Sequence, residues 1–427
     1  MEEAHRLALE LELQLALLGV ATAWAAGRAA AATDLRRHWN LDPEVAFLNH
    51  GSFGACPEPV LAKQGEWMRR LEREPVLFLH REIERHLDAA RGALAKFVGA
   101  QSDDLAFVQN ATAGVNTVLR SLKFAPGDEL ITTDQEYNAS RNALDFVAQQ
   151  AGAQVVVAAI PFPIAAPDVV LERVLAKVTA RTKLALIDHV SSPTGLVFPL
   201  EAIVRALAQK GVDTLVDGAH GPGQLPLELD RLGAAYYTGN CHKWMCTPKG
   251  SALLHVRRDK QAGIRPLPIS HGANSRRTDR SRFRLEFDWP GTFDPTPWLV
   301  IPDAIAFMGS LHPGGWDELR RRNRDLALHG RARLIEALQI AAPCPESMVG
   351  SLAAVPLPDA KATASQLEGD PLQVALFDRH KIEVPLPAWP APPKRLLRIA
   401  AQAYNRPEEY ERLAQVLPAL AREFGAK

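Results

Sequence analysis

The chain has 427 residues, 47% of them hydrophobic, which is enough for a large buried core and for a major and a minor domain. Its 49 basic and 49 acidic side chains cancel to a net charge of zero, so nothing in the charge indicates a nucleic-acid or polyanion partner. The four cysteines are scattered and the 13 histidines show no H-E-x-x-H spacing, so the sequence predicts neither a disulfide framework nor a metal site.

Residues 1–36 form an Ala- and Leu-rich segment, which we interpret as an N-terminal helix or extension. A secretory signal would begin with basic residues, whereas four glutamates lie within the first 12 residues here. These charges and Arg28 leave too short an apolar run for a membrane span. Together with the cysteine usage, this favours a cytoplasmic protein with no membrane partner; export through a degenerate signal is the alternative.

The next segments are a glycine-containing turn and a long helical pattern. A short apolar run ends in the turn Asn49–Gly54, whose glycines allow a close approach of the backbone or a positive φ. Residues 58–98 place Glu and Arg on one face and Leu, Phe and Trp on the other. This pattern predicts an amphipathic helix that we interpret as structural.

A strand at Leu105–Val108 runs into small residues, including Ala111 and Thr112, followed by a helical pattern to Leu122. The free amides and the dipole at such a helix start attract an anion such as phosphate. A threonine that merely caps the helix is the simpler interpretation, and the two are compatible.

Further apolar strands are predicted at 129–133, 154–160 and 183–190, with helices between them. This rhythm is typical of a parallel sheet with right-handed crossovers. Two of the strands end in polar turns, at 134–139 and 188–195. The serines of the second turn could serve a cofactor or substrate, or could cap the following helix.

Asp217 ends another buried-looking strand, and Lys243 lies just past the next one, at Ala234–Tyr237. In an open α/β sheet, ligands bind outside the carboxyl ends of the strands. Pyridoxal 5′-phosphate (PLP) needs a lysine for covalent attachment and an acid beside its pyridine nitrogen. Singly, an aspartate there could be a helix cap and a lysine a surface residue, but their order favours the cofactor. Lys249 is the rival lysine, in a place better suited to structure.

The rest of the chain predicts one more strand of the sheet, at 251–256, and then a charged, irregular stretch at 276–284. A helix after residue 300 leads into a smaller domain. Its plausible strands are 348–357 and 395–401, and a proline-rich segment, 384–393, joins them.

Seven segments together make the chain similar to the class V aminotransferase family of fold-type-I PLP enzymes, and within it to the isopenicillin N epimerase-like branch. The segments are FLNHGSFG (47–54), FVQNATAGVN (107–116), DQEYNA (134–139), DHVSSPTG (188–195), VDGAHGPGQ (216–224), GNCHKW (239–244) and GTFDPTP (291–297). They cover roughly residues 40–410 in the family's order.

The resemblance implies an α/β fold in which a mostly parallel seven-stranded sheet lies between helices. It implies a large PLP-binding domain over 37–300, whose first segment partly joins the other domain, and a smaller α+β C-terminal domain over 301–427. It also implies a homodimer with shared active sites and an amino-acid-like substrate.

The resemblance also implies roles for individual residues. Lys243 would bind the cofactor covalently and serve as the base for the Cα proton, Asp217 would keep the pyridine nitrogen protonated, and His220 would reach the phenolic oxygen. Tyr137 or Asn138 would stack on the ring, with Tyr137 also able to move protons. The remaining expected cofactor ligands are Ser192 and, for the phosphate, Ala111, Thr112, Asn240, His242 and the partner subunit's Thr292.

On the substrate side, the resemblance places Asn49 and His50 at the entrance of the active site. Arg398 matches the arginine that binds the substrate carboxylate in relatives. A guanidinium suits this role because it recognises a carboxylate through two parallel hydrogen bonds.

The sequence leaves the reaction open among epimerisation, β-elimination (C–S lyase or desulfurase) and transamination. An epimerase needs a second proton donor, for which Tyr137, His50 and His271 are candidates. Persulfide chemistry is disfavoured, because Cys344 lies in a segment that reads as structural and lacks the desulfurase loop. A PLP-binding protein without turnover is the alternative from another class.

Overall fold

The computed structural model describes residues 35–361 and 369–426. Nearly all of the N-terminal segment 1–36 lies outside the described residues, and so does the prediction made for it. Within the described ranges, no helix is long and apolar enough to cross a membrane.

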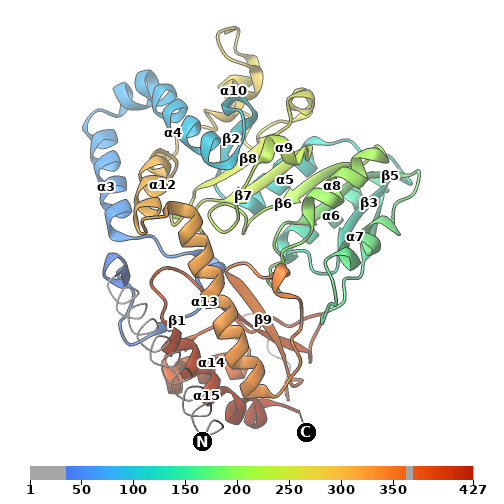
Figure 1. The fold of residues 1–427 in the computed structure, drawn as a ribbon. Helices are drawn as coiled ribbons and strands as arrows, with labels where there is room; N and C mark the ends of the chain where they lie inside the picture. The colour runs from blue at the N-terminus through green and yellow to red at the C-terminus, as the bar shows by residue number, and fades with distance from the viewer. Residues whose placement is uncertain (1–34, 362–368, 427) are drawn as a thin grey trace, which may run out of the picture.

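A seven-stranded sheet occupies the centre of the larger part of the molecule (Figure 1). Its strand order is β2-β8-β7-β6-β5-β3-β4, and every neighbouring pair is parallel except those made by β8. The predicted mostly parallel seven-stranded sheet is therefore confirmed. The strands are β2 (Leu105–Val108), β3 (Glu129–Thr133), β4 (Gln154–Ala158), β5 (Thr182–Asp188), β6 (Asp213–Asp217), β7 (Tyr236–Asn240) and β8 (Ala252–Val256).

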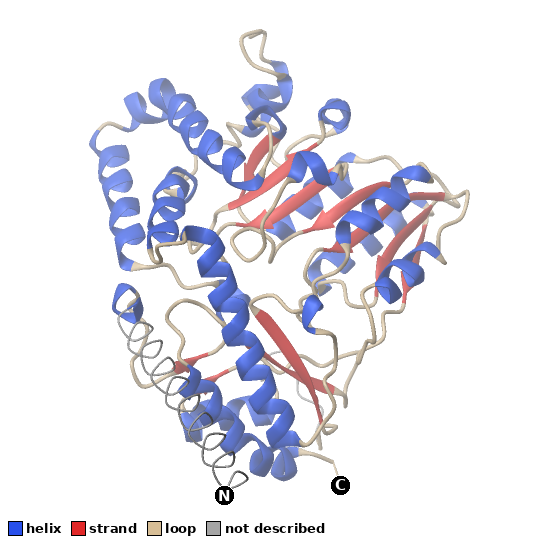
Figure 2. Ribbon diagram, in the orientation of Figure 1, coloured by secondary structure: helices blue, strands red, loops and turns tan. Residues whose placement is uncertain are grey.

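Helices cover both faces of this sheet (Figure 2), so the strands bury apolar side chains on each side. On β5, Leu184 and Leu186 pack with α5 (Ala111–Ser121) and α6 (Asn138–Ala151). Ala185 and Ile187 face the other core. That core includes α4 (Ile83–Val98), α7 (Asp168–Leu175) and α8 (Leu200–Gln209).

The smaller part contains two two-stranded sheets packed with helices. β9 (Leu352–Leu357) pairs antiparallel with β11 (Arg395–Ala400), and β1 (Ala46–Phe47) pairs parallel with β10 (Ile382–Glu383). The N-terminal strand β1 thus pairs with a strand that lies more than 300 residues later in the sequence. The boundary between the two domains stays a prediction. The helices of this part are α13 (Gly315–Leu338), α14 (Pro371–His380) and α15 (Pro407–Phe424).

The helical pattern over 58–98 is interrupted, contrary to the single helix expected from the sequence. α3 (Glu58–Arg73) ends at Glu74, which has φ −156° and ψ 82°. The physical reason is Pro75, which disfavours a helical conformation of the preceding residue. A π-helical turn at Leu77–Glu82 then leads into α4.

Shorter helices complete the fold. They are α2 (His50–Phe53), α9 (Leu229–Leu232), α10 (Arg282–Phe287), α11 (Thr296–Leu299) and α12 (Ile301–Ser310). The stretch 276–284, expected to be irregular, ends in α10.

A buried ion pair anchors the segment around α10 to α4. Arg91 is fully buried, donates to Asp288, and lies over the ring of Phe107 with its guanidinium carbon 5.1 Å from the ring centroid. Arg284 also donates to Asp288. A buried ion pair of this kind fixes geometry strongly, because removing one partner leaves the other charge desolvated.

We therefore expect Arg91→Ala to lower the free energy of unfolding by about 3 kcal/mol. Arg85→Ala is the matched control, because Arg85 makes an exposed ion pair on the same helix, and its loss should change stability by less than about 0.5 kcal/mol. Urea unfolding at a fixed protein concentration measures both values. Equal effects of the two substitutions would contradict the structural role of the buried pair.

Candidate active site

Asp217 ends β6 and is 3% exposed. Its Oδ2 accepts a hydrogen bond from Ser140 Oγ at 2.6 Å, and its Oδ1 accepts one from the Ala219 amide at 3.1 Å. Burial raises the pKa of this carboxyl, and the two hydrogen bonds and the positive charge of Lys243 oppose the rise. The residue is therefore a buried acid held in one orientation.

Lys243 lies in the turn that follows β7, within hydrogen-bonding distance of His220. Burial, helped by the positive charge of Arg398 and opposed by Asp217, lowers the pKa of Lys243 to about 7. The Lys243 Nζ lies 3.3 Å from His220 Nε2. At neutral pH a large share of this amine is uncharged and can act as a nucleophile.

The tautomer of His220 gives a second reason for a neutral Lys243. The indole Nε1 of Trp244 can only donate, and it lies 3.3 Å from His220 Nδ1, so Nδ1 accepts. A neutral ring then carries its proton on Nε2, which leaves Lys243 Nζ as the acceptor. Burial lowers the pKa of His220 well below its usual value, in agreement with an uncharged ring.

At the start of α5, where the sequence predicts an anion site, the capping residue differs from the expected one. Asn110, and not Thr112, caps the helix, because its side chain accepts from the Ala113 amide at 2.8 Å. Asn240 Oδ1 accepts from the Ala111 amide at 2.8 Å. Among the described residues no acceptor is found for the Thr112 amide, which leaves that amide and the hydroxyl of Thr112 for a phosphate.

His242 lies beside this region with one ring nitrogen engaged. Its Nδ1 lies 3.0 Å from the Ser251 carbonyl, which can only accept, so Nδ1 carries the proton. Burial lowers the pKa of His242 to about 4, and the ring is neutral at pH 7. Its Nε2 is then an acceptor, and it can donate to a phosphate only after gaining a proton.

Arg398 lies on β11 and is 6% exposed. Its Nη1 donates to the Ser192 carbonyl, its Nη2 lies 3.3 Å from Ser52 Oγ, and its Nε has no hydrogen-bond partner within the described residues. No acidic side chain in that part of the chain pairs with it. Burial lowers the pKa of Arg398 to about 10, because the charge is uncompensated. An anionic ligand would supply the missing charge.

A cavity of about 530 Å³ extends outward from Arg398. One wall is the turn at the start of α6, including the half-exposed Tyr137 and its neighbour Asn138, and the opposite wall is the proline-rich segment before β11. Its lining residues are Asp134, Glu136, Tyr137, Asn138, Arg141, Ser192, Pro193, Gln373, Pro385, Leu386, Pro387, Ala388, Trp389, Pro390 and Arg398.

The structure places Asn49 and His50 differently from the sequence prediction. His50 is fully buried, with Nε2 2.9 Å from the Lys243 carbonyl and Nδ1 2.8 Å from the Tyr404 hydroxyl. Asn49 Oδ1 accepts from Ser52 at 2.6 Å, and its amide donates to Glu383 at 3.0 Å. Both side chains are occupied within the protein, so neither is placed to bind substrate directly.

Other candidates lie outside the cluster around Lys243. Thr292 and His271 are exposed, and no contact joins either residue to that cluster within the described ranges. Lys249 Nζ donates to the Gly54 carbonyl at 2.8 Å, which is a structural contact. Cys344 is buried, and its sulfur lies 3.3 Å from Arg331 Nη1.

The sequence analysis missed several residues of the site. Ser140 directly follows the turn 134–139 and could have been found from that position. Glu136 and Asp188 are buried carboxyls whose pKa values are raised well above the usual range, by burial and by repulsion from each other and from Asp217. Trp244 and Tyr404 carry no local signal, because their roles depend on partners distant in the sequence.

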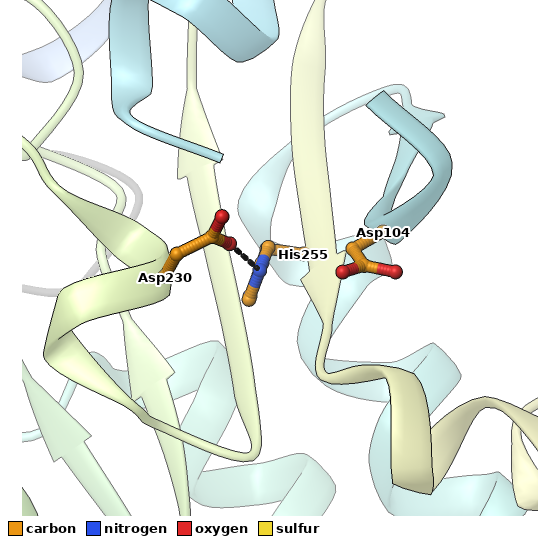
Figure 3. Close-up of side chains that lie close together, drawn as sticks. All are labelled: Asp104, Asp230 and His255. Carbon is orange, nitrogen blue, oxygen red and sulfur yellow. Dashed lines mark ion pairs between the residues drawn. The ribbon is translucent and has the colours of Figure 1, made fainter. Parts of the chain in front are cut away.

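A separate group, Asp104, Asp230 and His255, has candidate metal-ligand atoms within 4.8 Å of one another (Figure 3). His255 Nε2 lies 3.4 Å from Asp230 Oδ1. Asp104 Oδ1 already accepts from Arg258 at 2.6 Å and Gln261 at 2.7 Å. Asp104 is thus engaged by its own hydrogen bonds, whereas His255 has only the contact with Asp230, and the absence of a metal site stays a prediction.

Comparisons with known proteins show which family this chain is similar to. The model of the aminotransferase class-V family matches residues 55–347. Isopenicillin N epimerase of Amycolatopsis lactamdurans is 36% identical over 417 residues, covering 94% of this chain and 100% of that protein. A probable chloroplastic L-cysteine desulfhydrase of Arabidopsis thaliana is 30% identical over 405 residues, covering 90% of this chain and 84% of the relative. A solved structure of a C-DES mutant, with glycine covalently linked to its PLP cofactor, is similar with a TM-score of 0.72 at 21% identity, over 91% of this chain and 99% of that one.

The lowered pKa of Lys243 predicts the pH dependence of covalent PLP attachment to the apoprotein. Only the neutral amine reacts, so the rate should rise through pH 7 and level off above it. Arg398→Gln removes a positive charge that lowers this pKa, and should shift the midpoint to higher pH. Absorbance after rapid mixing measures the rate.

Lys249→Ala is the control for this measurement and should leave both attachment and midpoint unchanged. Lys243→Ala should abolish attachment. A wild-type midpoint near the ordinary lysine value of about 10.4 would contradict the buried, neutral amine.

Proposed function

The chain belongs to the class V aminotransferase family of PLP-dependent enzymes, and from this premise we propose that it is an amino-acid epimerase of the isopenicillin N epimerase type. The observation that carries the proposal is the pairing of a neutral, partly buried Lys243 with an unpaired, buried Arg398. A base and a carboxylate-binding group in one site suit the removal of a Cα proton. The full-length similarity to an epimerase favours that outcome.

In this proposal, PLP supplies an electron sink for negative charge at the substrate Cα. Lys243 holds the cofactor and, once released, takes the Cα proton at its Nζ. Asp217, oriented by Ser140, holds a proton on the pyridine nitrogen. His220 lies next to Lys243 Nζ and is assigned to the phenolic oxygen of the cofactor.

The phosphate of the cofactor is assigned to the start of α5. The amide and hydroxyl of Thr112 are the donors proposed. Ala111, whose amide is bound to Asn240, and His242, which can donate only in its protonated form, are proposed to lie next to the phosphate. Asn240 contributes by accepting from the Ala111 amide, which fixes the first turn of the helix. Ser192, on the Arg398 side, is assigned to the border between cofactor and substrate.

Arg398 is proposed to bind the substrate carboxylate with its free Nε and one Nη, in the paired geometry that guanidinium favours. The cavity of about 530 Å³ beyond it is proposed to receive the rest of the substrate. Tyr137 forms part of its wall and is proposed both to stack on the cofactor and to donate the second proton.

A PLP-dependent C–S lyase is the second candidate, supported by the similarity to L-cysteine desulfhydrases. Elimination begins with the same proton removal and would use Lys243, Asp217 and Arg398 in the same roles. A transaminase would also begin there. The three reactions differ only after the Cα proton has been lost.

Incubation of the holoenzyme with a panel of amino acids in deuterated water separates these candidates. An epimerase should give product with deuterium at Cα and inverted configuration, whereas a lyase should release pyruvate, ammonia and sulfide without any D-amino acid. Tyr137→Phe keeps the aromatic ring and should reduce inversion about 10²-fold while exchange without inversion persists. Exchange with none of the amino acids tried would contradict both candidates.

We propose a homodimer in which the partner subunit's Thr292 completes the phosphate site. Thr292 is exposed in this chain. The exposure of this loop residue leaves it available for an interface between two copies.

Thr292→Ala should therefore weaken PLP retention, whereas Thr278→Ala, an exposed threonine in a nearby segment, should not. Dialysis followed by cofactor absorbance measures retention, and sedimentation measures the mass. A monomer at micromolar concentration with PLP fully bound would overturn the shared site.

A cytoplasmic location also remains a proposal. It is supported by the four cysteines, Cys56, Cys241, Cys246 and Cys344, all of which are free thiols in the structure.

A further inference from the structure

The short helix α2 (His50–Phe53) contacts the lysine and the arginine of the site at the same time. Its first residue, His50, lies against the backbone of Lys243, and its third residue, Ser52, lies against Arg398. These contacts come from three segments that are distant in the sequence. Their arrangement suggests a link between cofactor attachment and carboxylate recognition.

The contact between His50 and Lys243 has a fixed direction. The Ala55 amide donates to His50 Nδ1 at 3.3 Å, so Nδ1 accepts and Nε2 carries the proton. Nε2 then donates to the Lys243 carbonyl at 2.9 Å. Burial lowers the pKa of His50 to about 3, so this tautomer is neutral across the working pH range. A neutral, fully buried ring can hold the lysine backbone but cannot shuttle protons.

Tyr404 sets the position of His50. Its hydroxyl lies 2.8 Å from His50 Nδ1, and the two ring centroids are 5.7 Å apart. Tyr404 follows β11 by four residues, and β11 carries Arg398. The segment that binds the substrate carboxylate therefore also fixes the orientation of His50.

The opposite side of α2 contacts Arg398 through Ser52. Ser52 Oγ accepts from Arg398 Nη2 at 3.3 Å and donates to Asn49 Oδ1 at 2.6 Å. At the end of the helix, Gly54 has φ +72°, and a Cβ there would lie 2.0 Å from the His242 carbonyl oxygen. The backbone of α2 is thus packed directly against the turn that carries the lysine.

We propose that α2 is a bridge that couples the binding of the substrate carboxylate at Arg398 to the position of Lys243, with His50 and Tyr404 as positioning residues. The bridge rests on the roles proposed above for Arg398 and Lys243. A second path supports it: His50 packs on Trp244 at a centroid distance of 5.0 Å, and Trp244 donates to His220 beside Lys243 Nζ. A substitution at one end of the bridge should therefore change the effect of a substitution at the other end.

A double-mutant cycle on Tyr404→Phe and Ser52→Ala tests the bridge, because Tyr404 contacts the first residue of α2 whereas Ser52, its third residue, contacts Arg398. Tyr404→Phe should lower kcat for Cα–H exchange about tenfold, the factor expected for one lost hydrogen bond, with KM changed less than about twofold. Ser52→Ala should mainly raise KM. The combined loss in kcat/KM should differ from the product of the single losses by about threefold or more.

Two further measurements separate positioning from general destabilisation. In apoprotein, Tyr404→Phe should also slow covalent PLP attachment at every pH, a readout independent of turnover. His50→Gln retains a donor for the Lys243 carbonyl and should keep more activity than His50→Leu at equal thermal stability. Tyr236→Phe, which removes a hydroxyl from β7 away from α2, is the control and should leave all values unchanged.

The bridge would be overturned if the loss of kcat/KM in the double variant equalled the product of the two single losses. An unchanged rate of PLP attachment in Tyr404→Phe would also overturn it. Covalent PLP on Lys243→Ala would instead overturn the proposed function. The two failures are therefore distinguishable.

Discussion

Two cationic side chains in one poorly solvated site, Lys243 and Arg398, form the constraint on which the rest of the site depends. Burial disfavours both charges, and the charge of Arg398 also disfavours the charge of Lys243. The guanidinium keeps its proton with a pKa of about 10, whereas the pKa of the amine falls to about 7. Near neutral pH the pair therefore contains one cation for a carboxylate and one amine free to react. A lysine in place of Arg398 would not divide the roles in this way.

Burial also controls the carboxyl groups of the site, where it raises the pKa values instead of lowering them. Three buried carboxyls, Glu136, Asp188 and Asp217, repel one another, and the pKa values of the first two rise well above the usual range. Asp217 is the one that accepts from both Ser140 and the Ala219 amide, which stabilise its charged form. The charged form is therefore favoured more at Asp217, the residue assigned to the pyridine nitrogen, than at the other two carboxyls.

The sequence predicted the parts of this arrangement that depend on local order along the chain. The alternation of apolar strands and helices predicted the sheet. The positions of Asp217 and Lys243 after strand ends predicted the site, because ligands bind at the edge of the sheet where parallel strands end. Contacts between distant segments were not predictable: His50 and Tyr404 are 354 residues apart. His50 was thus assigned to the substrate although its nitrogens are both engaged inside the protein. Thr112 was considered as a cap because its type suits one, whereas Asn110 occupies that position.

The residues shared by all three candidate reactions do not decide among them, because each reaction begins with the same proton loss. Inversion requires a second proton donor on the face opposite Lys243. The structure distinguishes the three candidates, which are His50, His271 and Tyr137. His50 donates to the Lys243 carbonyl and is neutral and buried. His271 lies exposed in a short 3-10 helix, and no contact joins it to the site within the described residues. Tyr137 lines the same cavity as Arg398 and has a hydroxyl that can donate. The choice between inversion and elimination therefore rests on Tyr137 and on the cavity that it shares with Arg398.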